Sequence, residues 1–159
     1  MFHQAIEPRT INVTEIREPN FSVDLPGDWE RAESPEAGAI AFREVDGPGS
    51  LIVLLLAVRP VYAIADRYRL LADYLKHRST YEQGADPAFA VSIPVASESG
   101  DIEGGWDGID ADGGRRLRHR TLFVGNLLAD FRFETSGLDE AAFHAVADSV
   151  LGSATVSAE

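Results

Sequence analysis

Cysteine is absent from the 159 residues of this chain, which excludes disulfide bonds, thiolate catalysis and cysteine-ligated zinc. Long apolar runs are absent as well. The longest, Leu51–Val58, is far shorter than the roughly 20 residues of a membrane-spanning helix. Residues 1–10 lack a basic region followed by an apolar run, the pattern of a secretory signal peptide. We therefore expect no transmembrane segment and a cytoplasmic location, or an envelope location if a leader has been removed.

Positive charge is scarce. The chain has 14 basic and 26 acidic residues, which gives a formal net charge of -12. A surface with this balance repels nucleic acids and anionic membranes, so neither is an expected partner. Apolar residues make up 45% of the sequence, which is enough for the buried core of one domain.

Catalytic motifs are also missing. The sequence has no phosphate-binding loop, no dinucleotide glycine fingerprint, no His-Glu-x-x-His pair and no Gly-x-Ser-x-Gly nucleophile. His119 falls on the expected core face of a strand, where a structural histidine is favoured over a general base. We expect a protein that is not an enzyme and that has no cofactor and no metal site.

Alternating apolar and polar residues predict strands. Phe21, Val23 and Leu25 alternate with polar residues, and Pro26 ends the run. Residues 101–105 read as an acidic turn. The apolar run at 51–58 has no polar face, which predicts a central strand covered on both sides. Further strands are expected at 11–16, 40–42, 89–93, 106–111, 116–124 and 127–134.

Helical spacing appears twice. A stripe of apolar and aromatic residues predicts a helix over about 62–83 that packs on the sheet through Ile64, Tyr68, Leu71 and Leu75. A second helix is expected to begin near Ser136 and Asp139, which resemble a capping box, and to end at Gly152. The last helix carries Phe143, Val146 and Val150 on one stripe.

This order of elements predicts the α+β class, with a twisted antiparallel sheet flanked by helices in an α/β/α sandwich. We expect one domain over residues 12–157, preceded by an N-terminal extension at 1–11. Trp29 and Trp106 are expected to act as structural anchors.

Two registers are possible across the turn at Gly125-Asn126. A two-residue turn pairs Val124 with Leu127 and places arginines beside phenylalanines. A three-residue loop pairs Phe123 with Leu127 and leaves the arginines on a polar face. We favour the three-residue loop because burial of an unpaired charge costs several kcal/mol.

In that register one basic face forms on the hairpin of an acidic protein. This face is either a solvated surface with cross-strand ion pairs or a docking surface for an acidic protein partner. Its expected partner-binding residues are Arg116, Arg118, Arg120 and Arg132. A small-molecule pocket between helix and sheet is a second candidate, with Tyr68, Trp106 and His119 as its lining.

The run Phe21-Ser-Val-Asp-Leu-Pro-Gly-Asp-Trp29, the central helix, the strand meander and the ending Phe143 to Val156 resemble the PsbP-like family, which includes the Mog, DcrB and LpqN types. The resemblance covers about residues 12–157. It implies an α/β/α sandwich and a non-enzymatic, partner-binding role. No site residues carry over, and the chain lacks the lipobox cysteine of the lipoprotein branch.

The predicted function is therefore a non-enzymatic cytoplasmic binding or adaptor protein with a protein partner. Two alternatives are kept: a small-molecule binding domain, and an adaptor similar to the chaperones of type VI secretion effectors in this family. A homodimer is also possible.

Overall fold

The computed structural model describes residues 13–34, 36–58, 64–85, 90–91, 95–99, 101–109 and 114–157. The expected N-terminal extension, 1–11, lies outside these residues. The strands are β1 Val13–Arg17, β2 Phe21–Pro26, β3 Trp29–Ala32, β4 Ala39–Glu44, β5 Ser50–Ala57, β6 Ala90–Val91, β7 Val95–Ser99, β8 Asp101–Ile109, β9 Arg115–Val124, β10 Leu127–Ser136 and β11 Thr155–Val156. The helices are α1 Ile64–Ala85 and α2 Glu140–Gly152.

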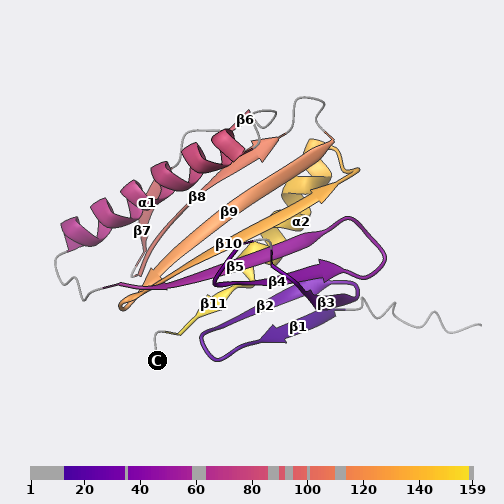
Figure 1. Cartoon of the computed structure of the whole chain (residues 1–159), viewed down its shortest axis with the longest axis horizontal. Coiled ribbons are helices and arrows are strands. Elements are labelled where there is room, and N and C mark those ends of the chain that lie inside the picture. The colour runs from indigo at the N-terminus through magenta and orange to yellow at the C-terminus, as the bar shows by residue number, and fades with distance from the viewer. Residues whose placement is uncertain are drawn as a thin grey trace, which may run out of the picture.

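An antiparallel sheet of eight strands forms the centre of the fold. Its order is β3-β4-β5-β10-β9-β8-β6, and β7 also pairs with β8. Helix α1 lies along the β7–β8–β9 side of the sheet (Figure 1). On the opposite face lie α2 and a small sheet with the order β1-β2-β11. The predicted class is confirmed: the fold is α+β, with a central antiparallel sheet between helices.

The larger core lies between the main sheet, α2 and the small sheet. The alternation in β2 buries Phe21, Val23 and Leu25, as expected for a strand with one face on the core. Phe21 packs edge to face on Phe131 of β10, with ring centroids 5.6 Å apart. From α2, Phe143 is buried in the same cluster.

Helix α2 begins one turn later than a capping box at Ser136 suggested. Asp139 is the N-cap, and its Oδ1 accepts a hydrogen bond from the Ala142 amide at 2.8 Å. Ser136 is the last residue of β10 instead.

A second core lies between α1 and the main sheet. Leu71 and Leu75 of α1 are fully buried there against Trp106 and Phe123. Tyr68 is exposed, so the predicted packing stripe is wrong at that position.

Residues 101–105 form the first half of β8 rather than an acidic turn. Gly105 lies directly opposite Arg120 in β9, and a Cβ on it would approach the His119 carbonyl oxygen to 2.2 Å. This glycine therefore allows two strands to approach closely and does not mark the end of a strand.

Strand β5 is central in the sheet, between β4 and β10, as predicted. Leu51 and Val53 point into the larger core and are buried. Ile52, Leu54 and Leu56, on the α1 side, are only half-buried. Helix α1 contacts β8 and β9 and leaves this part of the sheet partly uncovered. Neither helix in the described part of the chain is long and apolar enough to cross a membrane.

Candidate functional site: a charge chain beside a groove

The β9–β10 hairpin has the register of a two-residue turn and not that of the favoured three-residue loop. Val124 pairs with Leu127 across a two-residue turn. Gly125 has a φ of 58°, as the first central residue of a tight hairpin turn requires. Among the described residues, only glycines have a positive φ. The predicted three-residue loop is therefore wrong.

This register separates the four arginines. Arg116, Arg118 and Arg120 lie on the α2 side of the sheet, whereas Arg132 lies on the α1 side. The predicted single basic face does not form.

The expected cost of burying the arginines is offset by partners from distant elements. Arg118 donates to Asp107 at 2.7 Å and also pairs with Asp148 of α2. Arg120 donates to Glu103 at 2.7 Å and to the carbonyl of Leu151 near the α2 C-terminus, where a cation is favoured.

On the α1 side, residues of neighbouring strands align in rows across the sheet, because directly paired residues share a face. We name three rows after their β5 member. The Ser50 row contains Glu30, Arg43, Ser50 and Glu134. The Ile52 row contains Ala32, Ala41, Ile52, Arg132, His119 and Trp106. The Leu54 row contains Ala39, Leu54, Asp130 and Thr121.

Charged side chains from these rows, α1 and the segment before β4 form one chain of alternating sign. In order, its members are Arg115, Glu134, Arg132, Glu82, His119, Asp130, Arg78 and Glu36, and each pair of neighbours has an N···O distance within 3.5 Å. The interior members are buried or nearly so, and the two ends reach the surface. We call this set the charge chain. With His119 protonated it carries no net charge.

His119 lies at the buried centre of the charge chain. Its ring stacks on Trp106 with centroids 4.2 Å apart. Nδ1 lies 2.8 Å from Asp130 Oδ1, and Nε2 lies 3.3 Å from Glu82 Oε1. Burial lowers the pKa of His119, but the two carboxylates outweigh it and raise the pKa above its usual value. Both ring nitrogens then donate hydrogen bonds.

The two carboxylates respond in the opposite direction. Burial raises the pKa of Glu82, but His119 and Arg132 have the larger and opposite effect and lower this pKa to about 2. Burial likewise raises the pKa of Asp130, and His119 with Tyr74 and Arg78 outweighs it, so the pKa is lowered. Tyr74 donates to Asp130 at 2.7 Å. Ionised carboxylates therefore hold α1 on the sheet.

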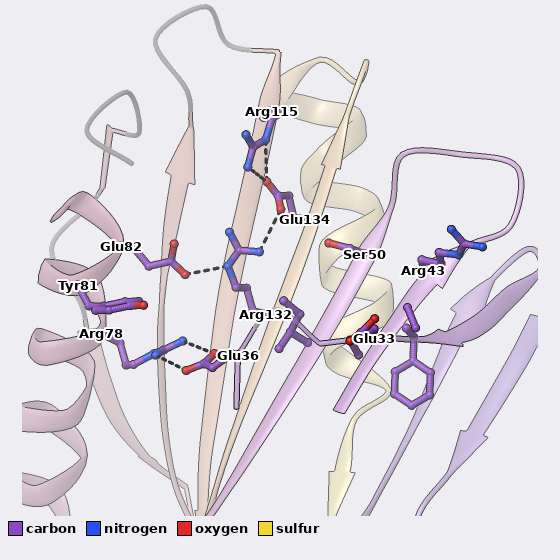
Figure 2. Close-up of a pocket in the computed structure, with 14 residues that line it drawn as sticks. Glu33, Glu36, Arg43, Ser50, Arg78, Tyr81, Glu82, Arg115, Arg132 and Glu134 are labelled. Atoms are coloured by element: carbon purple, nitrogen blue, oxygen red, sulfur yellow. Dashed lines mark hydrogen bonds and ion pairs between the residues drawn. The ribbon is translucent and has the colours of Figure 1, made fainter. Parts of the chain in front are cut away.

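A groove of about 480 Å³ lies beside the charge chain, between the second half of α1 and strands β4, β5 and β10 (Figure 2). Its apolar lining comes from Ala32, Ala41, Phe42 and Ile52. Its charged lining is four arginines and four glutamates: Arg43, Arg78, Arg115, Arg132, Glu33, Glu36, Glu82 and Glu134.

The two ends of the charge chain both line this groove. Arg115 is the positive end, and its side chain is 48% exposed. Glu36 is the negative end, held by Arg78 at 2.7 and 3.1 Å. Figure 2 shows them at opposite ends of the groove. Arg43 lies toward the Arg115 end, in the Ser50 row, with its side chain 66% exposed.

The predicted pocket residues are only partly brought together. Trp106 and His119 form the buried stack, whereas Tyr68 is exposed on α1. None of the three lines the groove. The sequence carried one signal for the groove: the apolar run of β5, whose residues on the α1 side are only half-buried in the fold.

The surroundings of His119 limit the chemistry available here. His119 has both nitrogens engaged by carboxylates, and its side chain has no exposed surface. Among the described residues, no group of three histidine, aspartate or glutamate side chains is placed to hold a metal ion.

Comparison with known proteins shows the fold. No family model and no curated protein matches the sequence. The solution structure of PsbP (CyanoP) from Synechocystis sp. PCC 6803 is similar, with a TM-score of 0.67 and 14% identity over 99% of this chain and 98% of that one. The crystal structure of LpqN, involved in cell envelope biogenesis of Mycobacterium tuberculosis, has a TM-score of 0.50 and 17% identity over 94% and 92%. The chain therefore has a PsbP-like fold, as its sequence resemblance suggested.

Proposed function

We propose that this protein is a non-enzymatic binding protein and that the groove receives an extended segment of a partner protein. The observation that carries this proposal is the partly uncovered α1 side of strand β5. Helix α1 packs on β8 and β9 and leaves Ile52, which lines the groove, and its neighbour Leu54 half-buried.

The floor of the groove suits apolar side chains. Ala32 and Ala41 lie in the same row as Ile52, and their small side chains leave the space that larger residues would fill. Burial of apolar surface contributes about 25 cal/mol per Å², so one inserted aliphatic side chain supplies about 1.5–3 kcal/mol of binding energy.

The charge chain favours binding over catalysis. Its ionised groups are paired with one another, and this arrangement holds the groove wall in place without a free acid, base or nucleophile among its described members. A rigid wall reduces the entropy lost when a partner binds.

The groove also favours a segment of a larger partner over a small molecule. Small-molecule sites typically bury 70–90% or more of their ligand. Here the rim residues Arg43 and Tyr81 are more than half exposed, so an occupant keeps one side open to solvent. A partner protein covers that side.

Location and assembly stay as predicted from the sequence: a cytoplasmic adaptor, with a homodimer possible. The involvement of LpqN in cell envelope biogenesis is a property of that protein. The type VI adaptor alternative is compatible with a groove for an extended segment.

Selection from a displayed library of short random peptides tests the proposal. The affinities of the enriched peptides are measured for the wild type and for the variants Ala32→Trp and Ala41→Phe. Both variants fill the groove from its floor. The matched control is Ala145→Trp, on the exposed surface of α2. Thermal denaturation checks that each variant folds.

We expect both groove variants to weaken binding by about tenfold or more, the effect of losing roughly 1.4 kcal/mol of apolar contact, while the α2 control binds normally. Failure to enrich any peptide, or equal binding by folded groove variants, would overturn the proposed function.

A further inference from the structure

We infer that the partner segment carries an acidic residue and a basic residue four positions apart, with an apolar residue midway between them. This inference rests on the proposed function and specifies the chemistry of its occupant. It follows from the charges at the two ends of the groove and from the spacing of the sheet rows between them.

One end of the groove is basic. Arg43 is in the Ser50 row, and Arg115 reaches the same row through its hydrogen bond to Glu134 at 2.8 Å. Both guanidinium groups are accessible, with side chains 66% and 48% exposed, and Arg43 is also paired with Glu30 of the same row at 2.5 Å. Glu134 is only 14% exposed and is shared between Arg115 and Arg132. A carboxylate of the partner is therefore favoured at this end.

The opposite end is acidic. The Glu36 carbonyl accepts a hydrogen bond from the Ala39 amide at the start of β4, which places Glu36 near the Leu54 row. Its carboxylate is held by Arg78, which also lies 3.5 Å from Asp130 of that row. Glu33 lines the groove as well and is exposed. A guanidinium or ammonium group of the partner is favoured here.

The distance between the ends follows from strand geometry. The Ser50 and Leu54 rows are four residues apart along β5, which corresponds to roughly 13 Å at about 3.3 Å per residue. An extended segment covers the same distance in four residues, and alternate side chains point to the same side. Its charged side chains at positions i and i+4 then meet the two ends.

The residue at i+2 falls over the Ile52 row. This row is where Ala32, Ala41 and Ile52 form the apolar floor. The predicted motif is therefore acidic-x-apolar-x-basic. It is readable in either chain direction, because the contacts that define it are made by side chains.

The test uses the peptides selected on the wild type, followed by synthetic copies with blocked ends. Matched peptides carry two acidic residues, two basic residues or two glutamines at the charged positions. The protein variant Arg43→Glu/Arg115→Glu makes both ends of the groove acidic. The control Arg17→Glu/Arg69→Glu makes the same change in net charge at exposed sites on β1 and α1.

We expect the selected pool to be enriched in the mixed-charge motif, and the mixed peptide to bind about tenfold more tightly than the glutamine peptide, as two exposed ion pairs would give. The groove variant should prefer the peptide with two basic residues, while the control variant keeps the wild-type preference. A change of preference is a result that simple loss of folding does not produce.

Three outcomes separate this inference from the proposed function. In the first outcome, the selected peptides need the open groove but carry no paired charges, or carry them at another spacing. This outcome overturns the inference and leaves the proposed function standing. An unchanged preference in Arg43→Glu/Arg115→Glu also overturns the inference. Peptides that bind equally well after the groove is filled from its floor overturn both.

Discussion

Substitution of His119 by glutamine removes the cation at the centre of the charge chain. The side chain is fully buried, and it separates the carboxylates of Asp130 and Glu82. Breaking one partner out of a buried ion pair costs about 3–5 kcal/mol. Glu82 keeps Arg132 at 2.8 Å, and Asp130 keeps the Tyr74 hydroxyl at 2.7 Å, so we expect a loss near the lower end of that range.

A loss of about 3 kcal/mol is a large part of the roughly 5–15 kcal/mol that stabilises a typical domain. Urea unfolding followed by tryptophan fluorescence measures it as a lower midpoint at an unchanged m-value. The matched control is Arg69→Gln, which removes an exposed pair with Asp66 at 3.5 Å and should cost less than about 0.5 kcal/mol.

A double-mutant cycle isolates the interaction itself. His119→Gln combined with Asp130→Asn should be less destabilising than the sum of the single changes, with a coupling energy of about 1–3 kcal/mol. The reasoning is refuted if His119→Gln stays within about 1 kcal/mol of the wild type and the two changes are additive, because that result would mean that the central cation is not needed to hold the carboxylates.

Three further predictions concern pH, strand approach and helix capping. The raised pKa of His119 contributes stability that is complete below about pH 6.5 and is lost as the pH rises through the raised pKa. Glu82, with its pKa lowered to about 2 from 4.5, contributes stability that is complete above pH 4.5 and is lost toward pH 2. Urea unfolding across this pH range should therefore show that the free energy of unfolding falls as the pH rises above neutral, and that this fall is smaller in His119→Gln. An equal fall in the variant would contradict the role assigned to His119. Gly105→Ala should destabilise the fold by more than 1 kcal/mol, measured by thermal unfolding, because its Cβ meets the carbonyl oxygen of the neighbouring strand at 2.2 Å; an unchanged melting temperature would argue against that contact. Asp139→Ala should lower the stability of the fold by about 1 kcal/mol, because it removes the N-cap of α2. Asp139→Asn should keep most of the stability that the N-cap contributes.

The predictable part of the fold is the part fixed by local patterns. The alternation at Phe21, Val23 and Leu25 identified β2, and helical spacing identified α1 and α2. The strand at 29–32 escaped prediction because its four residues, Trp-Glu-Arg-Ala, have no alternation to read.

The hairpin register could not be predicted in the same way. The free energy of the observed register depends on whether Arg118 and Arg120, on the α2 side of the sheet, form ion pairs and hydrogen bonds there. Those partners come from β8 and from α2, at sequence separations of 11 to 31 residues. The sequence suggested unpaired charge because it did not reveal these contacts.

The candidate site was missed for a related reason. The groove depends on how much of β5 is left uncovered by α1, and this depends on the position of the helix across the sheet. The apolar run at 51–58 marked the strand correctly, but the expectation of full cover on both sides concealed the incompletely covered floor at Ile52. Arg132 was singled out as a binding residue and does line the groove, although in a different setting from the one expected.

The most direct test of a binding groove on the α1 side of β5 is chemical-shift mapping by NMR, with isotope-labelled protein and the enriched peptide pool. We expect the largest amide shifts at Ala32, Ala41 and Ile52, with α2 and the small sheet unchanged. Shifts confined to α2 or the small sheet, or the absence of any enriched peptide to map, would contradict the groove as the binding site.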